Sequence, residues 1–258
     1  PTIKRSRSHD YVSKEVINVR ENVGLIEVAN FSKHEFKGPD ARKFLDHIMA
    51  GRLPKPGRIS LSPMLSYRGK LCGDLTVACL DENEFMVFGS GAAQEMHRRW
   101  FESHLDKFNL SYSNRSDEYH GLSIAGPNSR KVLEKIVRDD VSNEKFKFRD
   151  SRRMFVGGVP AIINRISFTG ELGYEIYVAP HYQLKLYEEL MEAGKEFNIK
   201  PFGGRALMSM RLEKNWGAWT LDYRPDFTAK ETGLDAFINW DKEFIGKESA
   251  QKENSSNK

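Results

Sequence analysis

A nine-residue motif occurs twice in this chain of 258 residues, and it constrains the fold more than any other feature. Residues 37–45 read KGPDARKFL, and residues 125–133 read AGPNSRKVL. Each copy follows a strand-like run and precedes a helix-like one, in which apolar residues recur at helical spacing. We therefore expect an internal duplication in which Asp40 and Asn128 each cap a helix.

The segments that follow the two copies predict the same order of elements. Three strands and a helix follow the first copy, at residues 59–66, 71–79, 85–89 and 92–105. Three strands and a helix also follow the second, at residues 154–156, 161–168, 174–178 and 182–197. The pattern predicts an α+β fold with two related units, each combining a mainly antiparallel sheet with helices. Because ligand sites are common in clefts between units, we expect a central pocket between them.

Composition excludes several function classes. With 40 basic and 36 acidic residues the net charge is only +4, which does not indicate nucleic-acid binding. No apolar run approaches the roughly 20 residues that span a bilayer, and the N-terminus has no signal-peptide pattern.

The only two cysteines, Cys72 and Cys79, indicate a reducing compartment. No metal site is predicted, because His97 and His104 lack neighbouring carboxylates. A glycine-containing loop at residues 89–94 lacks the third glycine of a dinucleotide-binding loop.

Residues 164–180, NRISFTGELGYEIYVAP, predict two strands around a turn that holds a single carboxylate. Gly170 and Gly173 flank Glu171 in this turn, and glycines let a backbone bend sharply and approach a ligand closely. The flanking strands would fix the direction of the Glu171 side chain. An ordinary solvated hairpin turn has the same composition, so the motif alone leaves both interpretations open.

Two other charged residues stand where they need a partner. Asp74 interrupts the strand-like run LCGDLTVAC, and alternation places it on one face with Cys72 and Thr76, pointing into a ligand space or to water. Arg205 falls in the first turn of the helix predicted within residues 202–214, where the helix dipole disfavours a cation. We expect a carboxylate or an anionic ligand to hold Arg205 there.

Together and in this order, these segments resemble the folate-binding family of the glycine-cleavage T protein (aminomethyltransferase). The family includes the C-terminal folate domains of dimethylglycine dehydrogenase and sarcosine dehydrogenase, and the dimethylglycine dehydrogenase branch is the most similar. The resemblance covers nearly the whole chain. It is carried by residues 19–41, 57–78, 85–105 and 121–133 and by the sequences FTGELGYE, GGRALMSMRLEKNW and GLDAFINWDKEFIGKES.

The resemblance implies roles for the charged residues. Glu171 would accept two hydrogen bonds from the pterin ring of tetrahydrofolate and fix its orientation. Asp74 would be the catalytic residue beside the folate nitrogens, where it stabilises an iminium cation and removes a proton. Arg205 would be a further pocket ligand. Three aromatic residues would supply the pocket walls, or pack in the core or hairpin instead: Tyr67, Phe168 and Tyr174. Many relatives carry tyrosine at the position of Phe168, and a hydroxyl bond to the ligand would be missing here.

The resemblance also implies a tetrahydrofolate-dependent enzyme of one-carbon metabolism. A flavin elsewhere oxidises dimethylglycine or sarcosine, and the methyl carbon arrives as an iminium or formaldehyde and yields 5,10-methylenetetrahydrofolate. Tetrahydrofolate is the expected cofactor, with FAD only on a separate domain or subunit. The expected partners are a small methylated amine or its iminium and a flavoprotein. The alternatives are a T-protein-like aminomethyltransferase acting on a lipoyl-bound aminomethyl group and a non-catalytic folate-binding or assembly module.

The expected domain plan comprises a linker or lead-in helix, a folate-binding domain and a flexible tail, at residues 1–20, 21–250 and 251–258. The repeat halves would lie at about residues 21–110 and 115–200. The first residues resemble the linker after a flavin domain, and relatives continue beyond the tail into a β-barrel domain. The chain is expected to be a short protein, part of a split enzyme or a segment of a longer one. A bacterial cytoplasm is the expected location, with the mitochondrial matrix as the alternative.

Overall fold

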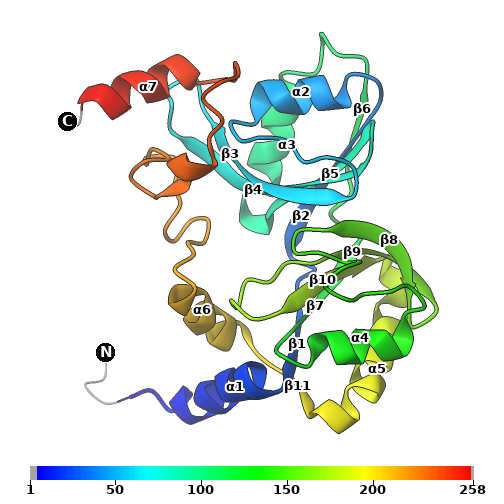
Figure 1. The fold of residues 1–258 in the computed structure, drawn as a ribbon. Helices are drawn as coiled ribbons and strands as arrows, with labels where there is room; N and C mark the ends of the chain where they lie inside the picture. Colours follow the sequence, from blue (N-terminus) through cyan, green and yellow to red (C-terminus); the bar gives the residue numbers. More distant parts are fainter. Residues whose placement is uncertain (1–4, 257–258) are drawn as a thin grey trace. The chain divides into compact units, whose positions relative to one another are not determined.

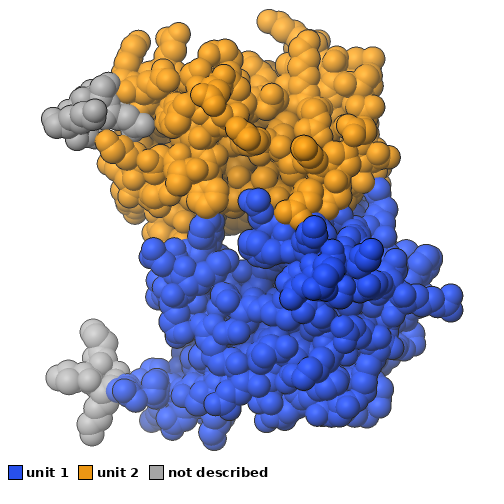
Figure 2. Space-filling view, in the orientation of Figure 1, with its two compact units in different colours: residues 1–29, 117–216 blue, residues 30–116, 217–258 orange. Residues whose placement is uncertain are grey.

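The structure is a computed structural model that describes residues 5–256. The chain divides into two compact units, coloured separately in Figure 2. Unit 1 comprises residues 1–29 and 117–216, and unit 2 comprises residues 30–116 and 217–258. Each unit therefore combines two segments that are distant in the sequence.

Unit 1 contains a six-stranded sheet with the strand order β11-β1-β7-β10-β9-β8. Its neighbouring strands are antiparallel except for β1 and β11, which are parallel. The strands are β1 (Val23–Glu27), β7 (His120–Ala125), β8 (Ser151–Val156), β9 (Val159–Asn164), β10 (Gly173–Val178) and β11 (Ile199–Pro201). The α-helices are α1 (His9–Glu21), α4 (Ser129–Ile136), α5 (Gln183–Ala193) and α6 (Gly204–Glu213), with short 3-10 helices η2 (Pro180–Tyr182) and η3 (Lys195–Phe197).

The two faces of the unit 1 sheet are covered differently. Helices α4 and α5 pack on one face (Figure 1), where Leu133 and Leu190 join the alternate apolar residues of the strands in the larger core. Part of the other face packs against α1 and α6, through Val19 and Met210 around Ala125 of β7. The same face also carries the polar residues Ser123, Asn164 and Glu175 on neighbouring strands.

Unit 2 contains a five-stranded antiparallel sheet with the strand order β3-β4-β5-β2-β6. The strands are β2 (Phe31–Lys37), β3 (Arg58–Leu65), β4 (Leu71–Asp81), β5 (Glu84–Ser90) and β6 (Ser111–Asn114). The helices are α2 (Ala41–Ile48), α3 (Gln94–Glu102) and α7 (Lys247–Ser256), with 3-10 helices η1 (Gly91–Ala93) and η4 (Leu234–Phe237). Phe44 and Leu45 of α2 and Phe101 of α3 complete an apolar core on one face of this sheet.

The repeated motif forms the same local structure in both units. Gly38 and Gly126 have φ angles of +135° and +129°, and each precedes an eight-residue helix, α2 or α4. A Cβ atom at Gly126 would lie 2.6 Å from the carbonyl oxygen of Asn22. Only glycine satisfies both constraints, because other residues rarely adopt such a positive φ.

The capping prediction for the two helices is wrong in its hydrogen bonds. Asp40 and Asn128 do stand at the N-cap positions, but neither side chain caps its helix. The Oδ2 atom of Asp40 instead accepts the backbone N–H of Asn109 at 2.8 Å, and Oδ1 of Asn128 accepts from Nζ of Lys131 at 3.0 Å. A distant backbone donor and a nearby cation compete successfully with the first-turn amides.

The predicted fold class is confirmed: the chain is α+β, with two mainly antiparallel sheets and their helices. Several boundaries shift. Strand β9 ends at Asn164 rather than residue 168, so eight residues connect it to β10. Helix α5 ends at Ala193, before Gly194 and the short helix η3. Helix α7 includes residues 251–256, and residues 257–258 of the predicted tail lie outside the described residues.

Candidate functional site

The predicted catalytic residue, Asp74, lies in the middle of β4 in unit 2. Alternation along this strand buries Leu75 and Val77 in the core and leaves Asp74 and Thr76 half-buried on the opposite face, as expected from the sequence. Cys72 is also half-buried but packs against the same core as Leu75, which differs from the expectation. The strand pairs with β3, where Pro63 is the neighbour of Asp74. Asp74 has no ion pair with any residue that the structure describes. Burial raises the pKa of its carboxyl to about 7.

A histidine of α3 fixes the strand beside Asp74. Nε2 of His97 donates a hydrogen bond to the carbonyl oxygen of Cys72 at 2.9 Å. The ring lies so near β4 that a Cβ on Gly73 would be 2.9 Å from Nε2. Burial lowers the pKa of His97 to about 4, so the ring is neutral near pH 7. His97 therefore acts as a positioning residue for the strand that presents Asp74.

The structure gives Glu171 a partner within unit 1. Its Oε1 atom lies 2.5 Å from NH1 of Arg20 in α1, and its side chain is 25% exposed. The same guanidinium donates to the carbonyl oxygen of Thr169 at 3.1 Å and to Oε2 of Glu213 at 2.6 Å. Arg20 thus ties α1, the predicted turn and the end of α6 together. Glu171 is engaged in this link.

Arg205 opens α6 as predicted, but it is exposed. Its NH1 atom donates to Oγ of Ser8 at 2.6 Å. Oε2 of Glu15 accepts a hydrogen bond at 2.9 Å from the backbone N–H of Gly203, the N-cap residue of α6. A carboxylate of α1 therefore stands at the start of α6, bonded to the backbone rather than to the Arg205 guanidinium.

The three predicted aromatic wall residues occupy different surroundings. Tyr67, in unit 2, is 65% exposed, and its hydroxyl lies 2.7 Å from Nε2 of His104. In unit 1, Phe168 is half-buried in the connection before Glu171. Tyr174 is fully buried in the larger core, where its ring stacks on Phe146 at 5.8 Å between centroids. Tyr174 therefore faces the helix-covered side of its sheet.

A different carboxylate of unit 1, Glu175, lies on the opposite face of β10 from Tyr174. Tyr177, two residues along the strand and on the same face, donates from its hydroxyl to Oε2 of Glu175 at 2.9 Å. On the neighbouring strands Glu175 is paired with Ser123 of β7 and Asn164 of β9. Asn164 is in turn paired with Ser151 of β8. These four residues, Ser151, Asn164, Glu175 and Ser123, form what we call the Glu175 row.

The surroundings of Glu175 alter its protonation. Burial raises the pKa of its carboxyl to about 7, against the opposing effects of the Tyr177 hydroxyl and of Lys214. Lys214, which follows α6, donates from Nζ to the carbonyl oxygen of Ser167 at 2.8 Å, and burial lowers its pKa. A half-buried carboxylate with one bonded oxygen and a cation close by is suited to accepting donors from a ligand.

Sequence reasoning passed over Glu175, although a usable signal was present. Alternation across residues 173–178 buries Tyr174 and Ile176 and puts Glu175 on the other face. A carboxylate in the middle of an apolar strand is the same signal that singled out Asp74. The glycines around Glu171 drew attention to the turn instead.

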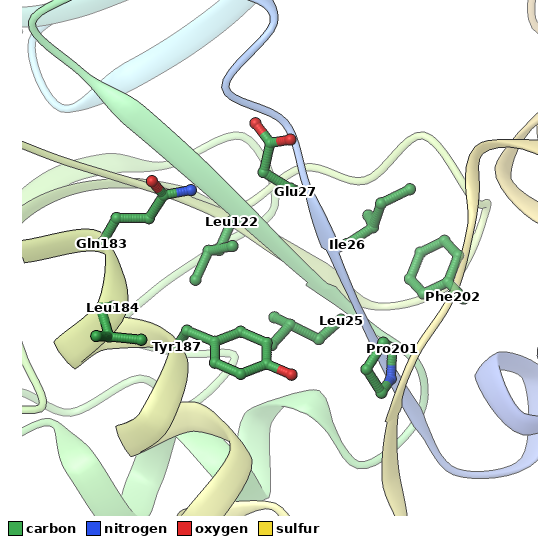
Figure 3. A pocket seen from close by; sticks show the side chains of 9 residues that line it. All are labelled: Leu25, Ile26, Glu27, Leu122, Gln183, Leu184, Tyr187, Pro201 and Phe202. Atoms are coloured by element: carbon green, nitrogen blue, oxygen red, sulfur yellow. The ribbon is translucent and has the colours of Figure 1, made fainter. Parts of the chain in front are cut away.

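Unit 1 also contains a groove of about 390 Å³, shown in Figure 3. Leu184 and Tyr187 of α5 lie on one side of it, and Pro201 and Phe202 lie on the other. Its lining is mostly apolar and includes none of the predicted site residues. The carboxylate of Glu27 at its edge accepts the backbone N–H of Ala29 at 2.8 Å.

Neither a metal-binding cluster nor a membrane-spanning helix is present in the described part of the chain. No group of three or more histidine, cysteine, aspartate or glutamate side chains is arranged to hold a metal ion within residues 5–256. Over the same residues, no helix combines the length and apolar character needed to cross a bilayer.

Comparison with known proteins decides the family. Residues 2–242 match the family described as the GCVT N-terminal domain. The chain belongs to this family. The resemblance inferred from the motifs is therefore confirmed.

The chain is also similar to two named enzymes. The chain is 36% identical over 253 residues to the dimethylglycine dehydrogenase of Mus musculus, whose name adds "mitochondrial", covering 96% of this chain and 29% of that protein. It is 29% identical over 239 residues to an aminomethyltransferase of Thermoanaerobacter pseudethanolicus, covering 91% of this chain and 64% of the relative. This chain thus spans about three tenths of the dehydrogenase.

A solved structure shows the fold independently. The glycine cleavage system aminomethyltransferase T of Bartonella henselae matches with a TM-score of 0.86 and 23% identity, over 95% of this chain and 66% of that one. The GCVT domain described here therefore has the T-protein fold that the motifs predicted.

Proposed function

We propose that this GCVT domain transfers a one-carbon unit to tetrahydrofolate, and that Asp74 assists the reaction. The observation that carries the proposal is the half-buried carboxylate of Asp74 in mid-strand, without an ion pair among the described residues. A structural role does not explain a half-buried carboxyl whose pKa is near 7, because such a group destabilises the fold when it ionises. Membership of a family with aminomethyltransferases supplies a chemical reason for it.

Asp74 would act as both base and charge stabiliser. Tetrahydrofolate supplies two nucleophilic nitrogens, and an iminium or formaldehyde supplies the carbon. With formaldehyde, two C–N bonds form and one water leaves, so both N–H protons end on the departing oxygen. Asp74 would take a proton from nitrogen and return it to that oxygen, which is general acid–base catalysis at one carboxyl. Its ionised form would also stabilise an iminium cation.

Glu175 is the residue that we propose to orient the pterin. A carboxylate accepts hydrogen bonds from an adjacent N–H and NH2 group much as it accepts a guanidinium. Oε2 of Glu175 is already fixed by Tyr177, which sets the direction of the carboxylate plane. The predicted role of Glu171 is an alternative in which the ligand displaces Arg20 from that carboxylate.

The remaining predicted site residues keep supporting roles in the proposal. Arg205 would hold an anionic part of folate, after exchanging its bond with Ser8. Tyr67, Phe168 and Tyr174 would line the pocket only if their surroundings rearranged, since Tyr174 belongs to the core.

The oxidation that provides the carbon would take place elsewhere. The mouse dimethylglycine dehydrogenase is more than three times as long as the region it shares with this chain. We infer that FAD, if used, binds a separate domain or subunit, and that a small methylated amine or its iminium is the donor. The chain would occupy the same compartment as its flavoprotein partner. That compartment would be a bacterial cytoplasm or the mitochondrial matrix.

The test is formation of 5,10-methylenetetrahydrofolate from tetrahydrofolate and formaldehyde in stopped flow, measured above the uncatalysed rate. The proposal expects acceleration by the wild-type chain. A rate equal to the uncatalysed one, with folate bound, would favour a non-catalytic folate-binding module.

A second candidate function is favoured by the Thermoanaerobacter relative, which is named an aminomethyltransferase. In that case the carbon donor is an aminomethyl group on a lipoyl protein, and ammonia leaves. Release of ammonia from an aminomethylated lipoyl protein, measured with and without tetrahydrofolate, would identify this activity. If no ammonia is released while the chain still converts formaldehyde and tetrahydrofolate, the result would favour the dehydrogenase-type reaction.

A further inference from the structure

The Glu175 row contains an amide with one unused hydrogen-bonding end. Asn164 is fully buried. Its Oδ1 atom accepts a hydrogen bond from Oγ of Ser151 at 2.7 Å. Its Nδ2 atom has no hydrogen-bond partner among residues 5–256. Because a buried amide donor that stays unpaired destabilises the fold, this position favours a ligand acceptor.

The neighbouring strand defines what that acceptor would belong to. Asn164 of β9 and Glu175 of β10 are directly paired, so their side chains leave the sheet on the same face. The strands are about 4.8 Å apart, close to the width of one edge of a pyrimidine ring. The pair presents a carboxylate acceptor beside an amide donor.

A 2-amino-4-oxopteridine has the complementary edge. Its 2-amino group and N3–H are adjacent donors, and the 4-oxo group beside them is an acceptor. With the two donors on Glu175, the 4-oxo oxygen would be the atom nearest to Nδ2 of Asn164. A 4-amino group in the same place would present a donor to a donor.

We propose that Asn164 binds the 4-oxo group of the pterin and makes the site select 4-oxo over 4-amino pteridines. The inference rests on the proposed folate function and on the assignment of the pterin to Glu175. It adds a specificity residue whose effect depends on one substituent of the ligand.

The test compares the dissociation constants of tetrahydrofolate and 4-amino-4-deoxytetrahydrofolate by calorimetry. The variants are Asn164→Asp and Asn164→Ala, with Asn128→Asp as the matched control. Asn128 lies in the same unit, at the start of α4, and its side chain bonds Lys131. Thermal unfolding of each variant verifies that it is folded.

For Asn164→Asp we expect the preference for the 4-oxo ligand to fall about tenfold or more, because a carboxylate accepts from the 4-amino group and repels the oxo oxygen. For Asn164→Ala we expect about tenfold weaker tetrahydrofolate binding, with the 4-amino ligand changed less than twofold. Asn128→Asp should keep the wild-type ratio.

Equal changes for both ligands in either folded Asn164 variant would overturn the inference and leave the proposed function standing. If the wild type binds neither ligand, the proposed function fails and the inference fails with it.

Discussion

The two units resemble each other on the helix-covered faces of their sheets and differ on the opposite faces. Each has a positive-φ glycine, an eight-residue helix and an apolar core on the first face. On the second face, unit 1 carries Glu175 bonded to a tyrosine, with Lys214 close by. Unit 2 carries Asp74, whose carboxyl pKa is raised by burial, while a hydrogen bond from its own backbone N–H acts in the opposite direction.

This difference separates two uses of a half-buried carboxylate. Glu175 is held in one orientation by Tyr177 and belongs to a row of polar residues, which suits recognition of a fixed ligand edge. Asp74 lacks a side-chain partner within the described part of the chain and has a pKa of about 7, which suits proton transfer near neutral pH. The duplicated framework thus supports a binding role in one unit and a reactive role in the other.

Removing the reactive carboxylate should have the largest effect. We expect Asp74→Asn to slow methylenetetrahydrofolate formation by about 100-fold or more, the usual contribution of a general base. The wild-type rate should rise with pH through about 7, as Asp74 ionises. Stopped-flow rates between pH 5.5 and 8.5 measure both effects. A variant that keeps the wild-type rate and pH profile would remove the reactive role from unit 2.

The buried histidine behind Asp74 should make unit 2 sensitive to acid. The folded pKa of His97, about 4, is below its unfolded value of about 6.5, so its contribution is complete above pH 6.5 and is lost as pH falls toward 4. We expect this loss to reach at most about 3 kcal/mol. His97→Gln, which keeps a donor for the Cys72 carbonyl, should flatten the pH dependence of unfolding free energy in urea titrations. Parallel curves for variant and wild type would contradict this assignment.

The raised pKa values of Asp74 and Glu175 give a pH dependence of stability opposite to that of His97. Folded pKa values near 7 exceed the unfolded values near 4, so the stabilising contribution is full below pH 4 and is lost as pH rises through 7. Asp74→Asn and Glu175→Gln should therefore stabilise the chain by roughly 1–3 kcal/mol at pH 8 and progressively less toward pH 5. Thermal unfolding at the two pH values measures the difference. A stabilisation independent of pH would indicate a packing effect instead.

The smallest effect is expected for the ion pair that engages Glu171. Its partner Arg20 is partly exposed and has a second carboxylate, Glu213. Glu171→Gln should therefore lower the free energy of unfolding by about 1 kcal/mol or less, because partly exposed ion pairs contribute little to stability. Urea unfolding at low and high salt measures it. A loss of several kcal/mol would show that the turn is a structural anchor of unit 1.

Local patterns in the sequence were sufficient to predict most elements of the fold. The helical spacing of Phe44 and Leu45 and the alternation around Asp74 depend on neighbours in sequence, and both appear as expected. The engagement of Glu171 by Arg20 joins residues 151 positions apart, and no local pattern reports it. At Asp40 the capping prediction failed for the same reason, since its partner Asn109 is distant in the sequence.

The candidate site was only partly predictable. Asp74 was found from its place in an apolar strand. Glu175 has the same signature, yet its proposed role depends on pairing with Ser123 and Asn164, and no pattern local to β10 indicates which strands lie beside it.

Calorimetric titration of tetrahydrofolate into Glu175→Gln and Glu171→Gln tests the central claim most directly. The account predicts at least tenfold weaker binding for Glu175→Gln, from the loss of charge-assisted hydrogen bonds, and less than threefold weakening for Glu171→Gln. Wild-type affinity in Glu175→Gln with a large loss in Glu171→Gln would contradict it and move the pterin to the turn.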